Sequence, residues 1–344
     1  MEPVTHALVS LALARAGQRR LPRFGTAMMV TAGLAADLDY ASYFGGASAF
    51  LRLHRAALHS LPGAVLIACA TAGAFCALDR KSGGNSAVAG NAAPARLSFV
   101  AAAIASAIGA VGHIVLDLAS GTGVQLFWPF HVRLYAWNIV PNLDAWILIA
   151  LIGGLLLPQL FRLVSEEIGD RKKRVRGRVA AIVTLALVAA YLGGRAMLHS
   201  EAVDLLLSPE YRGQVPLAAG AFPSSSPFDW RGVVVTDNTI EEIDVGVEAS
   251  ARFDPDRSLA HYKPDDSPAL RAGQQADATQ TFLKYARFPL AHVERFEDGY
   301  RFELHDLQFE SGDLGPENIF VRVDLDSSLR VTRQEFLFAS HPNP

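Results

Sequence analysis

The sequence predicts an α-helical polytopic membrane domain of about five spans plus a short N-terminal helix, followed by a mainly β soluble domain. Of its 344 residues, 51% are apolar, which is more than in a typical soluble domain. Long uncharged segments are confined to the first part of the chain, and later residues are rich in charges and turn formers. We therefore divide the chain into a membrane-embedded domain at residues 1–198 and a soluble, extracytoplasmic β domain at residues 199–344.

The N-terminal segment contains a short apolar helix at about residues 4–16. It is too short to cross a hydrocarbon layer of about 30 Å. Its basic residues follow the apolar stretch, whereas in a signal peptide they precede it. We expect a half-inserted helix or one buried in a bundle, with signal-anchor behaviour as the alternative.

Five further segments are apolar and uncharged, and we interpret each as a span: residues 24–36, 61–78, 97–116, 145–161 and 179–194. A Gly-, Ala- and Ser-rich loop at 79–96 predicts flexibility. Residues 120–142 are rich in aromatic side chains, as at a membrane interface.

The C-terminal part alternates apolar and polar residues in short stretches, which predicts strands. The clearest are residues 232–236, 300–304 and 319–323, and residues 222–227 form a turn-rich entrance to the domain.

Basic clusters predict the sidedness of the membrane domain. Residues 171–178 form the strongest cluster, and the positive-inside rule places it in the cytoplasm. Counting spans outward places the basic residues of 15–23 and 80–96 on the same side. The C-terminal domain is then extracytoplasmic.

Ionisable residues lie at the ends of the apolar segments, all on the predicted outer face: Asp37, Asp39, His54, His59, His113 and Asp117, with His6 as a further candidate. Such groups are costly to keep beside a membrane, so a functional site is the default hypothesis.

These residue types predict a divalent metal site. His113 and Asp117 are four residues apart, so one helix face presents an imidazole and a carboxylate. Imidazole and carboxylate ligands suit zinc, with manganese as the alternative, and a metal makes water nucleophilic near neutral pH. Asp37 and Asp39 offer oxygen ligands, and Asp39 is also a candidate catalytic carboxylate. Arg55 is suited to stabilising an anionic transition state.

Each residue also has an ordinary interpretation. A lone histidine near an interface is usually a polar interfacial residue, and Arg55 can extend to lipid headgroups. The spacing of His113 and Asp117 is a weak signal alone, and the hypothesis depends on all candidates sharing one face. The net charge of −3 is spread along the chain, which argues against nucleic-acid binding.

Several motifs stand in one order along residues 1–150: Thr5-His6, Asp37-Leu38-Asp39, His54-Arg55 with His59-Ser60, His113 with Asp117 and Ser120, and Gly123-Val124 with Trp128-Pro129. This arrangement resembles the bacterial inner-membrane proteins classed as metal-dependent hydrolases and related to the LexA-regulated membrane protein. The resemblance implies an inner-membrane location and metal-dependent hydrolase chemistry.

We therefore expect a membrane-bound hydrolase that uses a metal-activated water. Because the site is expected at headgroup depth, phospholipids or other lipid-linked phosphoesters are the substrate class that we favour. The alternative is a non-enzymatic membrane protein with a structural metal site and an extracytoplasmic β interaction domain. A transporter is disfavoured, because the ionisable residues lie at span ends and not at mid-membrane.

Overall fold

The computed structural model describes residues 1–82, 96–167, 177–247, 253–309 and 316–339. The chain forms two compact units. The first comprises Met1–Asp39, Arg55–Phe130 and Tyr135–Gly194, and the second comprises Tyr40–His54, His131–Leu134 and Arg195–Pro344.

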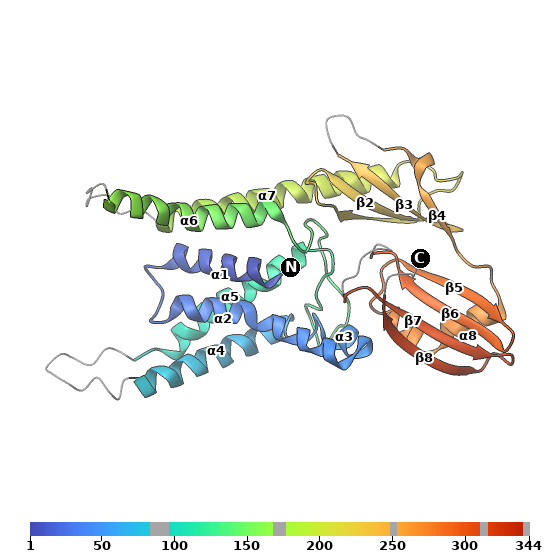
Figure 1. Cartoon of the computed structure of the whole chain (residues 1–344), viewed down its shortest axis with the longest axis horizontal. Helices are drawn as coiled ribbons and strands as arrows, with labels where there is room; N and C mark the ends of the chain where they lie inside the picture. The colour runs from blue at the N-terminus through green and yellow to red at the C-terminus, as the bar shows by residue number, and fades with distance from the viewer. Residues whose placement is uncertain (83–95, 168–176, 248–252, 310–315, 340–344) are drawn as a thin grey trace. The chain divides into compact units, whose positions relative to one another are not determined.

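The first unit is a bundle of apolar helices. They are α1 (Pro3–Gly17), α2 (Gly25–Ala35), α4 (Leu61–Ser82), α5 (Phe99–Ala119), α6 (Ala145–Glu167) and the part of α7 (Gly177–Leu207) up to Gly194. Helix α5 packs against α1, α2 and α4 (Figure 1). The chain start, the end of α2 and the end of α5 lie at the same end of this bundle (Figure 1).

Small residues allow α2 and α5 to approach closely. A Cβ on Gly109 of α5 would lie 2.1 Å from the backbone oxygen of Met29 in α2, and one on Gly33 would lie 2.1 Å from Oγ of Ser10 in α1. Close approach through small residues is how helices pack in membranes, where no hydrophobic effect drives them together.

The expected number of spans requires correction. Among the described residues, three helices are long and apolar enough to cross a membrane, Leu61–Lys81, Phe99–Ala119 and Gly177–Leu207, and Ala145–Phe161 is a shorter apolar helix. Five spans are therefore not supported. Helix α2 has only 11 residues, or about 16 Å of helix, because the chain leaves the α-helix at Ala36, where the 3₁₀ helix η1 (Ala36–Gly45) begins.

Two predicted loops fall largely outside the described residues. Helix α4 continues through Ser82, so the first part of the predicted flexible loop is helical, and its residues 83–95 are not described. Residues 171–176 of the basic loop are likewise not described.

The second unit contains two four-stranded antiparallel sheets (Figure 1), in agreement with the predicted β domain. The first sheet has the order β1 (Ala218–Pro223), β2 (Asp229–Val235), β3 (Thr239–Gly246) and β4 (Leu259–Tyr262). The second has the order β5 (Pro289–Phe296), β6 (Gly299–Asp306), β7 (Ile319–Asp326) and β8 (Val331–Phe338). The stretches expected to be strands fall on β2, β6 and β7.

Helices cover both sheets of this unit. Ala202 and Leu206 of α7 share a core with Trp230 of β2. The second sheet is covered by α8 (Pro268–Gln275), α9 (Asp277–Phe282) and, through Phe50, α3 (Ala47–Leu53). A further 3₁₀ turn, η3, spans Pro255–Arg257. The segment before His54 therefore belongs to the β unit, although apolar helices flank it in the sequence.

The glycine contact between α2 and α5 yields a stability prediction. We expect Gly109→Ala to lower the free energy of unfolding by about 1–3 kcal/mol, because the new methyl group displaces a backbone rather than a side chain. Thermal and denaturant unfolding in detergent would measure the loss. Gly73→Ala in α4 is the matched control, since a Cβ there meets nothing within 4 Å. Equal effects of the two substitutions would contradict the packing argument.

Candidate metal centre

Five candidate ligands come together at one end of the first unit. His6 belongs to α1, Asp37 follows α2 in η1, His59 lies in the turn before α4, and His113 and Asp117 lie one turn apart on α5. Four of them, all except Asp37, have side chains that are at most 1% exposed, whereas the Asp37 side chain is 19% exposed. Segments distant in sequence thus deliver metal-binding side chain types to one place.

His59, His113 and Asp117 form the tightest group. Nε2 of His113 lies 3.0 Å from Nε2 of His59 and 3.1 Å from Oδ2 of Asp117. Nε2 of His59 lies 3.2 Å from the same oxygen. The three atoms therefore mark a nearly equilateral triangle.

The other ring nitrogen of each histidine fixes its tautomer. Nδ1 of His113 is 2.8 Å from the backbone oxygen of Gly33, and Nδ1 of His59 is 2.8 Å from Oδ2 of Asp39. Both oxygens are acceptors, so each Nδ1 donates and each neutral ring keeps a lone pair on Nε2. Such partners on the remote nitrogen are the usual outer contacts of metal-binding histidines.

With both rings neutral, three acceptors face one another at short range. In a buried site this arrangement is costly unless a cation lies between them. Ligand atoms around a tetrahedral zinc ion with bonds of about 2.0 Å are separated by about 3.3 Å, close to the observed spacing. One shared proton could bridge a single pair of atoms and would leave the third acceptor unsatisfied.

Two further residues flank the triangle on different sides. Oδ1 of Asp37 lies 3.6 Å from Nε2 of His113, and Nε2 of His6 lies 3.3 Å from Oδ1 of Asp117. The His6 ring stacks on His113, with centroids 3.7 Å apart. Neither ring nitrogen of His6 has a hydrogen-bond partner among the described residues. Two groups in the described part of the chain could thus hold an ion, His6–His113–Asp117 and Asp37–His59–His113.

Burial and charged neighbours shift the pKa values at the centre in both directions, and burial lowers the pKa of His6 to about 4. Burial opposes a charged imidazole at His59, but contacts with Asp117 and Asp39 outweigh it and raise the pKa of His59 to about 9. Burial raises the pKa of the Asp37 carboxyl above its ordinary value. Asp117 also meets the amino group of Met1 and, at 3.8 Å, the guanidinium of Arg55. The carboxylates of Asp39 and Asp117 that raise the pKa of His59 are also groups that a metal cation would bind.

Comparison with known proteins identifies the family. A family model described as YdjM inner membrane protein matches residues 1–202. The chain belongs to the YdjM inner membrane protein family. No curated protein and no solved structure matches it.

The match confirms the predicted resemblance at the level of an inner-membrane family. Its description names a membrane location and no reaction, so hydrolase chemistry and a link to LexA go beyond it. All five candidate ligands lie inside the matched region, and most of the β unit lies outside it. The candidate metal centre thus lies in the YdjM part of the chain.

The structure gives other positions to three of the candidate residues. His54 lies in the second unit, with its ring stacked on Phe50 at 4.3 Å and Nε2 3.6 Å from Oε1 of Glu317. Asp39 contacts Nδ1 of His59, the ring nitrogen that faces away from the candidate centre. Arg55 is 7% exposed and lies beside Asp117.

Some supporting residues were not anticipated. Ser60 begins α4: its Oγ accepts from the backbone N–H of Gly63 at 3.0 Å and donates to the backbone oxygen of Ala57 at 2.7 Å. A serine directly before an apolar helix is a recognisable N-cap, so the sequence already indicates this role. The role of the Gly33 carbonyl in orienting His113 could not be predicted, because every residue has a backbone carbonyl and the sequence does not show which one a side chain will contact.

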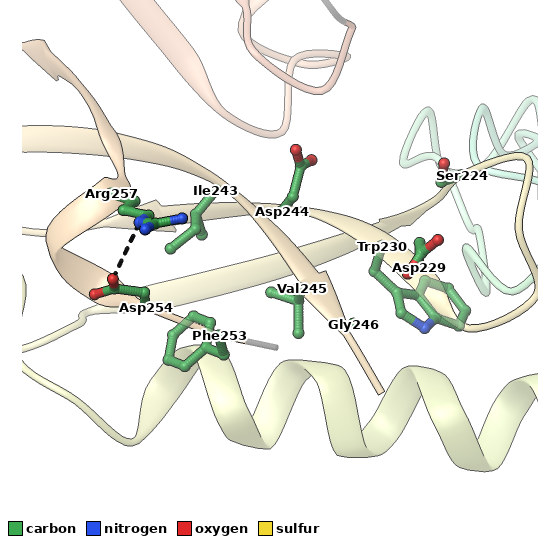
Figure 2. Close-up of a pocket in the computed structure, with 10 residues that line it drawn as sticks. All are labelled: Ser224, Asp229, Trp230, Ile243, Asp244, Val245, Gly246, Phe253, Asp254 and Arg257. Atoms are coloured by element: carbon green, nitrogen blue, oxygen red, sulfur yellow. Dashed lines mark ion pairs between the residues drawn. The ribbon is translucent and has the colours of Figure 1, made fainter. Parts of the chain in front are cut away.

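The second unit contains a cavity of about 670 Å³ with different chemistry. Its lining includes the carboxylates of Asp229 and Asp244, and Asp254 pairs with Arg257 at 3.3 Å (Figure 2). Among the described residues, no metal-binding group of three side chains falls in this cavity. Candidate metal chemistry is therefore concentrated in the first unit.

The triangle predicts which substitutions abolish metal binding. We expect His113→Ala and Asp117→Asn to weaken binding by at least about a hundredfold, because even outer contacts of ligands are worth about 10- to 100-fold. Elemental analysis of the detergent-purified protein and chelator competition would measure it. His54→Ala is the matched control and should retain the metal. Loss of metal in that control would contradict the assignment.

Proposed function

We propose that this YdjM-family protein is a membrane-bound, metal-dependent hydrolase whose ion is held by His59, His113 and Asp117. The observation that carries the proposal is the triangle of buried acceptor atoms spaced 3.0–3.2 Å apart. Three protein ligands with a further position left open are typical of catalytic zinc, whereas structural zinc is closed by four. Zinc is favoured, with manganese as the alternative.

When bound, such an ion supplies Lewis acidity that makes water nucleophilic near neutral pH. Asp37 lies on the accessible side of the centre, since it alone of the five side chains has substantial exposure. Its Oδ2 has no hydrogen-bond partner among the described residues. We assign Asp37 to accept the proton that the attacking water gives up and to return it to the leaving oxygen. Asp39 keeps His59 oriented.

Lipid phosphoesters are the substrate class that we favour. Exposed aromatic side chains lie between the end of α5, which carries the centre, and the first turn of α6: Trp128 and Phe130 follow α5, Trp137 precedes α6, and Trp146 lies in its first turn. Tryptophans at helix ends mark the headgroup region of a membrane. A hydrolytic centre beside this belt is at the depth of the phosphoester bonds of lipids.

The second candidate function is a structural metal site in a non-enzymatic membrane protein whose β unit is an interaction module. His6 favours it, because its unpartnered Nε2 lies 3.3 Å from Asp117 and could complete four protein ligands. X-ray absorption spectroscopy of the metal-loaded protein separates the two: four protein ligands with no water indicate the structural role.

Hydrolysis itself gives the next prediction. Purified protein reloaded with zinc or manganese should cleave bis(4-nitrophenyl) phosphate or phosphatidylglycerol in mixed micelles. Chelation should abolish the reaction, and metal should restore it. Asp37→Asn should retain metal but lower turnover by about 10²- to 10⁴-fold, the usual worth of a positioned base. A metal-loaded protein that hydrolyses neither compound would overturn the phosphoester assignment.

We also propose that the centre and the β unit are extracytoplasmic, because basic residues gather at the other ends of the helices: Arg15 in the last turn of α1, Arg80 and Lys81 in that of α4, and Arg178 at the start of α7. Alkaline phosphatase is expected to be active when fused after residue 344 and inactive when inserted in residues 83–95, since its disulfides form only outside the cytoplasm. The reverse pattern of activity would place the centre on the cytoplasmic face.

A further inference from the structure

Arg55 is unusual in both its backbone and its side chain. Its φ of 57° lies in the left-handed region, which residues with a Cβ rarely occupy. Its side chain is enclosed, with only 7% of the residue exposed. A buried arginine on a disfavoured backbone persists only where its surroundings hold it there.

The backbone of Arg55 connects two parts of the candidate centre. Its N–H donates to Oδ2 of Asp39 at 2.9 Å, the same oxygen that accepts from Nδ1 of His59 at 2.8 Å. Its carbonyl accepts from the backbone N–H of Gln125 at 2.9 Å. The segment that follows α2 is thus joined, through one residue, to the loop that follows α5.

The guanidinium of Arg55 meets the end of α5. Nη1 lies 3.4 Å from Oγ of Ser120 and 3.5 Å from the backbone oxygen of Gly123, at the limit of hydrogen bonding. It lies 3.8 Å from Oδ1 of Asp117. These contacts direct the positive charge at the ligand carboxylate, which is not where a transition-state-stabilising group would be aimed.

We propose that Arg55 is a positioning residue with two separable roles. Its left-handed backbone holds Asp39, and through Asp39 the ring of His59, while its guanidinium holds Asp117 and the turn after α5. This inference rests on the proposed metal centre and replaces the transition-state role that the sequence favoured for Arg55. It predicts that backbone and side chain contribute separately to metal affinity.

Two substitutions separate the roles. Arg55→Gly removes the guanidinium but adopts a positive φ freely. Arg55→Ala removes the same group and disfavours that backbone. The zinc dissociation constant, measured on the full chain in detergent by chelator competition, should be lowest for the wild type. It should be higher for Arg55→Gly and about fivefold higher again for Arg55→Ala, because the left-handed conformation is costly for alanine. Circular dichroism melting confirms that each variant is folded.

The link through Asp39 is tested in the Asp39→Ala background. Without the Asp39 carboxylate, the N–H of residue 55 no longer orients His59 through it. Arg55→Gly and Arg55→Ala should then bind zinc equally. Equal affinities in the Asp39 background but not in the wild type support the proposal. The proposal would be overturned if the two variants bound zinc equally in both backgrounds, or if their dissociation constants differed by the same factor in both. Either result would leave the metal centre intact. Absence of zinc binding by the wild type would instead refute the metal centre itself.

Discussion

The contact of Gly109 with the backbone of Met29 sets how near α5 can come to α2. At that separation the Gly33 carbonyl, on α2, accepts from Nδ1 of His113 on α5. Because Nδ1 is engaged with this carbonyl, the ring presents its other nitrogen, Nε2, to the centre. The packing of the two helices thus decides which nitrogen of this candidate ligand is available. The remaining ligands are arranged around that nitrogen.

Much of this centre was predictable because it depends on regular spacing. The four-residue interval between His113 and Asp117 needs only a helix, and the apolar surroundings of both residues made that helix evident. The positions of Asp37 and His59, at the ends of apolar segments, predicted that they would share one end of the bundle. The division between helical and β regions followed from composition in the same way.

The unpredicted features depend on contacts between distant segments. His54 and Arg55 are neighbours in sequence, yet His54 packs with Phe50 in the β unit and Arg55 packs beside Asp117 in the helical one. Nothing local distinguishes a ligand from its orienting partner, and so Asp37 and Asp39 looked equivalent. The predicted number of spans was wrong for a related reason. A short apolar helix such as α2 can be covered by neighbouring helices, and apolar composition alone does not show whether protein or lipid surrounds it.

The hydrogen bond from His113 to Gly33 also limits how many ions His113 itself can bind. The two groups that can hold a metal both include His113, but its Nδ1 is committed to the carbonyl. Only Nε2 remains, and one nitrogen lone pair binds one ion. The two groups therefore cannot both use His113 at the same time. Whichever candidate ligands take part, His113 can serve only one ion at a time.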